Sequence, residues 1–187
     1  MTTKRGRLWY VLGPSGAGKD SVINYARERL GAEACVLFAH RYITRPADAG
    51  GENHVALRPD EFALRERAGL FVLTWHRNDL SYGIGIEVEQ WLARGLDVVV
   101  NGSRSALPLA ERRFPGLIPL WIGASSEVLA QRLAARGRES EEQIHQRLAE
   151  AGAFSPPTNA RVLLNDGELA EAGETLLAWL RGETVPH

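Results

Sequence analysis

A glycine-rich segment near the start of the chain carries the clearest chemistry. Residues 13–19 read Gly-Pro-Ser-Gly-Ala-Gly-Lys, which matches the phosphate-loop pattern G-x-x-x-x-G-K. Glycines let the backbone curl so that successive N–H groups face phosphate oxygens, and a helix N-terminus adds partial positive charge. The lysine can reach the β- and γ-phosphates as a mobile cation. We therefore predict that the phosphates of a nucleotide bind to Gly13, Pro14, Ser15, Gly16, Ala17, Gly18 and Lys19.

The residue after the lysine departs from this pattern. The template has serine or threonine there, whose hydroxyl binds Mg²⁺, whereas this chain has Asp20 followed by Ser21. Because carboxylates are natural oxygen ligands of Mg²⁺, Asp20 and Ser21 are predicted to hold the metal, Asp20 either directly or through water. The alternative is that the Asp20 side chain only caps the helix that follows.

Arginines in the last third of the chain form a second candidate set. Arg132 and Arg136 lie four residues apart on one face of a predicted helix, and Arg147 lies on the next predicted helix. Like charges at that spacing repel, which is reasonable if an anion binds there. We expect a lid over about residues 132–147, in which these three arginines neutralise a transferring phosphoryl group. The alternative is a solvated face that pairs with Glu141 and its neighbours.

A polar region from about residue 41 to residue 84 is the candidate acceptor pocket. Its first part, the loop from Arg41 to His54, is too long and too glycine-rich for a simple connector. No residue stands out as a general base, and an acceptor that is itself a phosphate needs none, so transfer from phosphate to phosphate is favoured. Ordinary loop polarity is the alternative for each candidate, and is preferred for Asp48 and His54. The candidates are Arg41, Arg45, Glu52, Tyr82, Asn101 and Arg104.

The composition excludes several classes of protein. The 187 residues fit one domain, and 44% hydrophobic residues with a net charge of −1 indicate a globular protein that does not coat nucleic acid. Only Lys4 and Lys19 are lysines among 22 basic residues, a bias that either coding or phosphate recognition by arginine explains. Cys35 is the one cysteine, so no intrachain disulfide forms. Without the roughly 18 consecutive apolar residues of a membrane span, we expect a cytoplasmic protein with no membrane partner; its oligomeric state is not indicated.

Alternating strand and helix patterns surround these residues. Apolar runs predict buried strands at 7–12, 35–39, 70–75, 96–100, 117–122 and 161–164. Helices are expected at 21–30, 60–68, 84–95, 105–114, 125–136, 140–151 and 169–180, with a capping box at Ser140 and Gln143. The stretch 41–58 is expected to be irregular. Strands that are apolar throughout and alternate with helices predict an α/β fold, in which helices cover both faces of a parallel sheet.

The chain resembles the guanylate kinase superfamily over nearly its whole length. The matching segments are Gly13–Lys19, Thr44-Arg45, Tyr82-Gly83, Arg132–Arg138, Ser140-Glu-Glu and Leu164-Asn-Asp166. The resemblance implies a three-layer P-loop fold over residues 1–187, with an inserted acceptor-binding segment and a lid. It also implies that Asn165 and Asp166 belong to a loop that packs on adenine. The chain departs from this superfamily where guanine and its phosphate are recognised, at Arg41, Asp48, His76, Ile84 and Asn101–Ser103.

Those departures are similar to the ribose 1,5-bisphosphate phosphokinase family of bacterial phosphonate catabolism. The shared segments are Lys19-Asp-Ser21, Phe38–Asp48, Gly51–His54, Tyr82–Gly85 and Val100–Arg104. The resemblance implies that the enzyme uses ATP, with Mg²⁺, to convert ribose 1,5-bisphosphate, a small phosphorylated sugar, to 5-phospho-α-D-ribose 1-diphosphate. On this interpretation Arg41, Arg45 and Arg104 bind the acceptor's two phosphates, and Glu52 and Asn101 bond to ribose hydroxyls. The alternatives are a true guanylate kinase and a non-catalytic binding module of the same fold.

Overall fold

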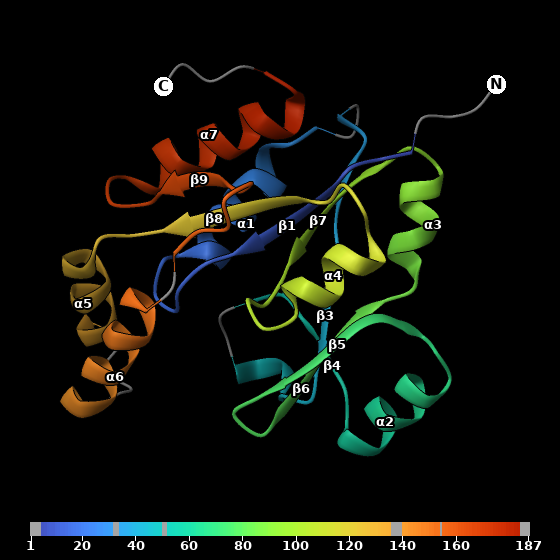
Figure 1. Ribbon diagram of the computed structural model, residues 1–187, viewed down its shortest axis with the longest axis horizontal. Coiled ribbons are helices and arrows are strands. Elements are labelled where there is room, and N and C mark those ends of the chain that lie inside the picture. Colours follow the sequence, from blue (N-terminus) through green and yellow to red (C-terminus); the bar gives the residue numbers. More distant parts are fainter. Residues whose placement is uncertain (1–4, 32–33, 50–51, 136–139, 154, 184–187) are drawn as a thin grey trace. The chain divides into compact units, whose positions relative to one another are not determined.

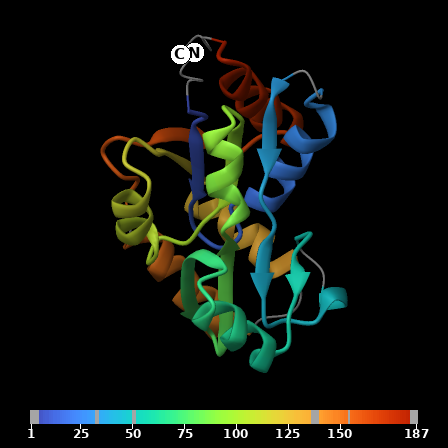
Figure 2. The same cartoon turned by 90° about the vertical axis from the view of Figure 1, so that its right-hand side faces the viewer.

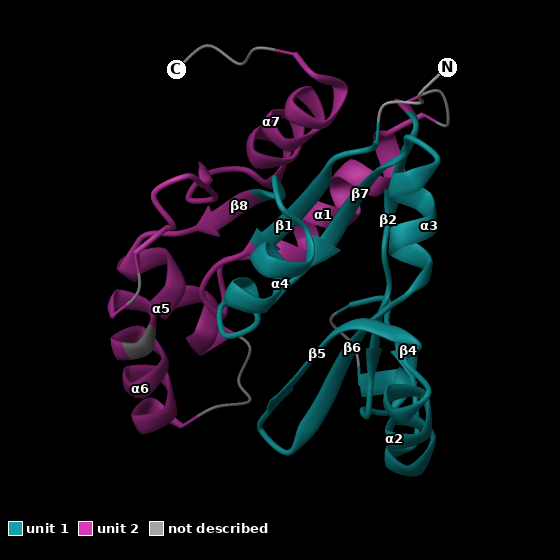
Figure 3. Cartoon of the chain, turned by 45° about the vertical axis from the view of Figure 1, so that its right-hand side comes forward, with its two compact units in different colours: residues 1–11, 35–118 teal, residues 12–34, 119–187 magenta. Residues whose placement is uncertain are grey.

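The structure is a computed structural model that describes residues 5–31, 34–49, 52–135, 140–153 and 155–183. It divides into two units, one of residues 1–11 and 35–118 and the other of residues 12–34 and 119–187 (Figure 3). Among the described residues, no helix is long and apolar enough to cross a membrane.

Parallel strands form the first sheet of unit 1 (Figure 1). β7 (Asp97–Asn101) lies between β1 (Leu8–Leu12) and β2 (Val36–Phe38), and both pairings are parallel. Every residue of β1 is buried, as its unbroken apolar run predicts, whereas β2 is only half-buried. Helices α3 (Glu87–Ala93) and α4 (Leu107–Arg113) belong to the same unit. These strands and helices confirm the predicted α/β class.

A second sheet in unit 1 was not predicted (Figure 2). Its strand order is β4 (Val55–Ala56), β3 (Arg41–Ile43), β6 (Leu80–Gly85) and β5 (Phe71–Arg77), and only β3 and β4 are parallel. The prediction that 41–58 is irregular was therefore wrong, since this stretch holds two strands and a 3₁₀ turn, η2, at Ala47–Ala49. α2 (Pro59–Arg67) lies between β4 and β5 in the chain.

The prediction of a helix from residue 84 was also wrong at its start. Ile84 lies in β6, and the helix begins at Glu87. The apolar spacing that suggested a helix is shared with the buried end of a strand, so periodicity could not separate the two. The better signal was Asn78-Asp79, whose φ angles of 49° and 60° make the tight turn between β5 and β6.

Aromatic rings pack the second sheet against α2. The Phe71 ring lies 4.8 Å from the ring of Phe62 and 5.5 Å from that of Tyr42, centroid to centroid. Gly83 makes room for it, because a Cβ at that position would lie 2.8 Å from Phe71 Cδ1. This packing holds the Tyr82-Gly83 pair that the sequence singled out.

Unit 2 combines two parallel strands with four helices. β8 (Ile118–Gly123) pairs with β9 (Arg161–Leu164), and the helices are α1 (Lys19–Arg29), α5 (Ser126–Ala135), α6 (Glu141–Gly152) and α7 (Leu169–Arg181). The capping box at the start of α6 is confirmed, since the side chains of Ser140 and Gln143 each bond to the other's backbone N–H. α1 packs on α7, where Gly173 lies directly against the Tyr25 ring.

We predict that Gly173→Ala destabilises the protein. The added methyl would overlap the Tyr25 ring, so α1 and α7 must move apart. Such overpacking costs about 1–3 kcal/mol, which exceeds the gain of up to about 1 kcal/mol from replacing glycine in a helix. Urea unfolding followed by circular dichroism measures the free energy of unfolding.

Gly152→Ala is the matched control for this substitution. Gly152 also lies in a helix, but a Cβ there meets nothing within 4 Å, so its stability should be unchanged or raised. A Gly173→Ala protein as stable as the wild type would contradict the packing described here.

Candidate active site

The backbone of the glycine loop in unit 2 has a conformation that other residues disfavour. Gly13, Gly16 and Gly18 have φ angles of 150°, 90° and 81°, all in the region that favours glycine. A Cβ at Gly13 would overlap the carbonyl oxygen of Ile122, and one at Gly18 would lie 2.5 Å from Asn165 Nδ2. Both conformation and close packing therefore require glycine at these two positions.

Lys19 lies at the junction of the loop and α1. Its Nζ donates to the carbonyl oxygens of Gly13, at 3.1 Å, and Pro14, at 2.8 Å, so the ammonium group lies across the loop. The N-cap residue of α1 is Gly18, and Asp20 lies inside the first helical turn. Asp20 is therefore not the N-cap residue of this helix.

Asp20 and Ser21 are consecutive residues in that first turn of α1 whose side-chain oxygens could bind a metal ion. Asp20 is half-buried, and Ser21 is exposed. A carboxylate and a hydroxyl are hard oxygen ligands, which fit the preference of Mg²⁺ and not that of soft transition metals. In the described part of the chain, no group of three or more His, Cys, Asp or Glu side chains could form an all-protein metal site.

Two of the predicted lid arginines contact the glycine loop. Arg147 Nη1 donates to Ser15 Oγ at 2.7 Å, and Arg132 Nη1 donates to the Ala17 carbonyl at 3.5 Å. Both side chains are half-buried. Arg136, the third arginine of the set, lies outside the described residues. Two positive groups from separate helices thus reach the same loop as Lys19.

Asn165, which the resemblance assigns to a loop that packs on adenine, also holds the glycine loop. Its side chain is 3% exposed, and Nδ2 donates to the Ala17 carbonyl at 2.8 Å. Asp166, its neighbour, accepts a 2.6 Å hydrogen bond from the Ser125 backbone N–H just before α5 begins. The two residues therefore connect the end of β9 to the loop and to the first lid helix.

Arg41 and Glu52 form an ion pair in unit 1. Arg41 Nε donates to Glu52 Oε1 at 2.6 Å, and Nη2 contacts Oε2, with side chains only 15% and 10% exposed. The Arg41 guanidinium lies 5.3 Å from the ring centroid of Tyr82, which stacks at 5.4 Å on Trp75. The structure thus brings together Arg41, Glu52 and Tyr82, three of the predicted acceptor residues. The arginine and the carboxylate bind to each other.

His54 contacts Arg45 and the backbone of Glu52. Its Nδ1 lies 3.3 Å from Arg45 Nη2 and 3.1 Å from the Glu52 carbonyl oxygen, and its Nε2 lies 3.2 Å from the Arg45 carbonyl oxygen. The imidazole is buried. The sequence favoured ordinary loop polarity for His54, because a single histidine in a polar loop carries no pattern that predicts such contacts.

The predicted acceptor residues Asn101 and Arg104 flank a tight segment that contacts Tyr10. Asn101 is buried at the end of β7, and Arg104 is half-buried after it. The Tyr10 hydroxyl donates to the Ser103 carbonyl at 2.9 Å and accepts from the Ser103 N–H at 3.0 Å. Burial raises the pKa of Tyr10 to about 12, against smaller lowering by the Ser103 bond and the Arg41 charge. Sequence reasoning missed Tyr10, since an aromatic residue in an apolar strand is typical of a core.

These two groups of residues have complementary chemistry. Unit 2 presents a glycine loop with Lys19, Arg132 and Arg147 around it, which suits a polyphosphate. Unit 1 presents arginines together with a carboxylate and amide side chains, which suits a ligand that carries both phosphates and hydroxyls. Among the described residues, neither group shows an evident general base.

Known proteins support this interpretation at the level of the whole chain. No family model matches the sequence. Proteins named ribose 1,5-bisphosphate phosphokinase PhnN are 65% identical over 182 residues in Chromobacterium violaceum, with 97% of each chain covered, and 55% identical over 176 residues in Thiobacillus denitrificans, with 94% of this chain and 93% of that one covered. A protein of the same name in Laribacter hongkongensis is 66% identical over 180 residues; the alignment covers 96% of this chain and 44% of that longer one. Among solved structures, a guanylate kinase from Anaplasma phagocytophilum has a TM-score of 0.68 at 16% identity over 96% of this chain and 86% of that one, which shows a shared fold.

Protein stability should depend on pH through Tyr10. The folded-state pKa of about 12 exceeds the ordinary value of 10.0, so the neutral hydroxyl stabilises the fold fully below pH 10, and this contribution is lost as pH rises toward 12. Between pH 10 and pH 12 the free energy of unfolding should decrease with pH more steeply in the wild type than in Tyr10→Phe. The difference between the two slopes should be about 1.4 kcal/mol per pH unit. Denaturant titrations at a series of alkaline pH values measure both slopes, and equal slopes would contradict the assignment.

Proposed function

The chain belongs to the ribose 1,5-bisphosphate phosphokinase family, and we propose that it transfers the γ-phosphoryl group of ATP to the 1-phosphate of ribose 1,5-bisphosphate. A bond forms between an oxygen of that phosphate and the γ-phosphorus, the bond to the β–γ bridging oxygen breaks, and ADP leaves with 5-phospho-α-D-ribose 1-diphosphate as the product. The observation that carries the proposal is identity above half of all aligned positions, over nearly the full length, to two proteins with that name.

The glycine loop is the proposed site of the ATP phosphates. Lys19 and the loop N–H groups would hold the β- and γ-phosphates, for which the left-handed glycines and the position of Nζ across the loop provide support. Asn165, which holds the Ala17 carbonyl, would keep the loop in this shape. The role of Asp166 is then to support the start of α5 through Ser125.

Mg²⁺ is the proposed metal, because the oxygen donors at the start of α1 fit it. Asp20 and Ser21 would hold it, and it would shield the negative charge of the donor phosphates.

The lid arginines are proposed to stabilise the charge of the transferring group. Arg132 and Arg147 already contact the phosphate loop, so each is placed to meet an anion bound on it. Arg136 is proposed for the same role from its spacing in the sequence alone. A set of fixed cations of this kind substitutes for solvent water around the phosphoryl group.

The acceptor is proposed to bind in unit 1 through the segment 41–84 and the turn after β7. Arg41, Arg45 and Arg104 would bind its two phosphates, with Tyr82 beside them, while Glu52 and Asn101 would bond to the ribose hydroxyls. The 1-phosphate is ionised at neutral pH, so the reaction needs alignment and charge neutralisation but no general base. The scarcity of evident bases in this set supports the assignment.

A direct comparison of acceptors tests the proposed function. With ATP and Mg²⁺, we expect kcat/KM for ribose 1,5-bisphosphate to exceed that for GMP by about 10⁴-fold, since a site without guanine partners leaves the polar edges of the base unpaired. A coupled assay for ADP, with the product identified by mass spectrometry, measures both. Preferred turnover of GMP would identify a guanylate kinase, and ATP binding without turnover of either acceptor would identify a non-catalytic module.

The metal assignment predicts a changed Mg²⁺ requirement in Asp20→Ala. We expect the Mg²⁺ concentration for half-maximal activity to rise about 10-fold or more, because one oxygen ligand or its water-mediated equivalent is lost. Asp60→Ala is the matched control, since Asp60 also lies in the first turn of a helix but its carboxylate pairs with the exposed side chain of Arg58. An unchanged Mg²⁺ dependence in Asp20→Ala would refute this role.

A further inference from the structure

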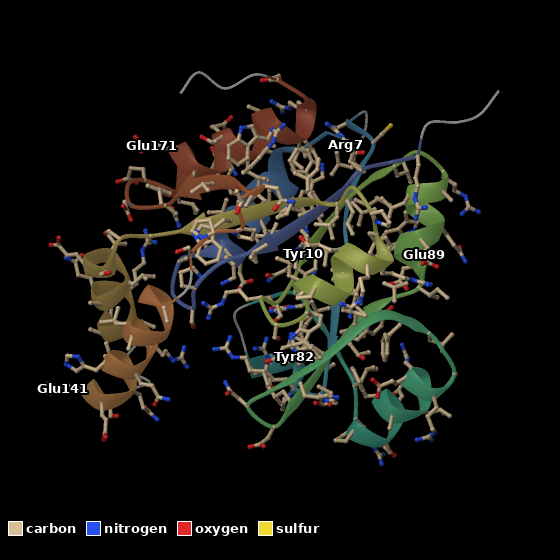
Figure 4. The ribbon with its side chains drawn as sticks, in the orientation of Figure 1. Arg7, Tyr10, Tyr82, Glu89, Glu141 and Glu171 are labelled. Carbon is tan, nitrogen blue, oxygen red and sulfur yellow. The ribbon has the colours of Figure 1, made fainter. Side chains whose placement is uncertain are left out.

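Tyr10 has an unusual location for a polar group. It lies in the middle of β1, opposite Val100 of β7, and is fully buried (Figure 4). A phenylalanine would fill the same space without bringing a hydroxyl into the core, where a polar group is costly unless it is hydrogen-bonded. The hydroxyl therefore needs an explanation beyond packing.

The hydroxyl closes a double hydrogen bond on one residue. It accepts from the Ser103 N–H and donates to the Ser103 carbonyl, at 3.0 Å and 2.9 Å. Both backbone groups of Ser103 are thus satisfied by a side chain from a different strand. This replaces the ladder bonds that a continuing strand would have made after β7 ends at Asn101.

The Tyr10 ring also shapes the turn through Gly102. A Cβ at Gly102 would overlap ring atoms of Tyr10, while the Gly102 N–H donates to the Val11 carbonyl at 2.8 Å. The backbone after Asn101 therefore packs against the Tyr10 ring at Gly102 and is hydrogen-bonded to the Tyr10 hydroxyl at Ser103. Asn101 and Arg104, on either side of these two residues, take their positions from this contact.

The charge of Arg41 reaches the same hydroxyl. The positive charge of Arg41 lowers the pKa of Tyr10, in opposition to the larger effect of burial. Arg41 is itself fixed by Glu52 and lies over Tyr82. The two proposed parts of the acceptor site, the turn 101–104 and the segment 41–84, both belong to unit 1.

We propose that Tyr10 is a positioning residue for acceptor recognition, whose hydroxyl sets the turn 101–104 so that Asn101 and Arg104 face the phosphorylated sugar. Tyr10 touches neither substrate in this proposal and acts through Ser103 and Gly102. The inference rests on the proposed function, because it concerns how that acceptor is bound. It also explains why a hydroxyl is kept in an otherwise apolar strand.

Steady-state kinetics of Tyr10→Phe and Gly102→Ala test the proposal. Loss of the hydroxyl, or a methyl group against the ring, should each move the turn and raise KM for ribose 1,5-bisphosphate about 10-fold. KM for ATP should stay within about twofold of the wild type, because the donor residues lie elsewhere in the chain. A general loss of stability would not produce this difference between the two substrates. Assays are run well below each variant's melting temperature.

Tyr25→Phe is the matched control for loss of a tyrosine hydroxyl. Tyr25 donates to Glu174 at 2.7 Å on a helix of unit 2, so both KM values should be unchanged. If the wild type turns over the acceptor but the acceptor KM is unchanged in Tyr10→Phe and Gly102→Ala, the role of Tyr10 is overturned and the proposed function is not. A rise of both KM values together would have the same consequence. Absence of acceptor turnover by the wild type would overturn the proposed function and this inference with it.

Discussion

The glycine loop depends on a single constraint, the backbone conformation at Gly13, Gly16 and Gly18, which favours glycine. Gly13 and Gly18 also have no room for a side chain, because Ile122 and Asn165 pack directly on them. The Ala17 carbonyl then accepts hydrogen bonds from Asn165 and from Arg132, so the loop is held from outside as well as by its own curl. Because a phosphate-binding backbone must be set before the ligand arrives, these supports are as much a part of the site as the lysine.

Charge is balanced differently in the two units. In unit 2 the cations Lys19, Arg132 and Arg147 contact uncharged oxygens of the loop, namely carbonyls and a serine hydroxyl. In unit 1 the Arg41 guanidinium contacts the Glu52 carboxylate while both are largely buried. A buried pair of this kind is expensive to break but leaves an N–H fork already oriented, which suits recognition of a second anion better than a mobile side chain does. The same carboxylate can accept from hydroxyl groups, as a sugar phosphate requires.

Local sequence patterns predicted the elements that depend on neighbouring residues. The loop and its helix, the capping box of α6 and the bounds of β9 follow from residues within a few positions of each other, and the structure confirms them. The stretch 41–58 was mistaken for an irregular segment because its strands are two and three residues long. These short strands exist through pairing, of β4 with β3 and of β3 with β6. Ile84 was misassigned because the pairing of β6 with β3 and β5 likewise joins residues that are distant in the chain. Pairing partners distant in the chain leave no periodic signal.

The sequence by itself determined the α/β class, the phosphate loop with its lysine, and the aspartate that replaces the usual hydroxyl residue. The resemblance over nearly the whole length also indicated the family, because the order and spacing of motifs can be read directly from the sequence. The tertiary structure alone decided that Arg147 meets Ser15, that Asn165 holds Ala17 rather than standing free, and that Arg41 pairs with Glu52. It also decided that Tyr10 supports Ser103, 93 residues away. Hydrogen bonds of this kind join side chains to backbone that folding brings near, and no rule of composition or spacing encodes which groups will meet.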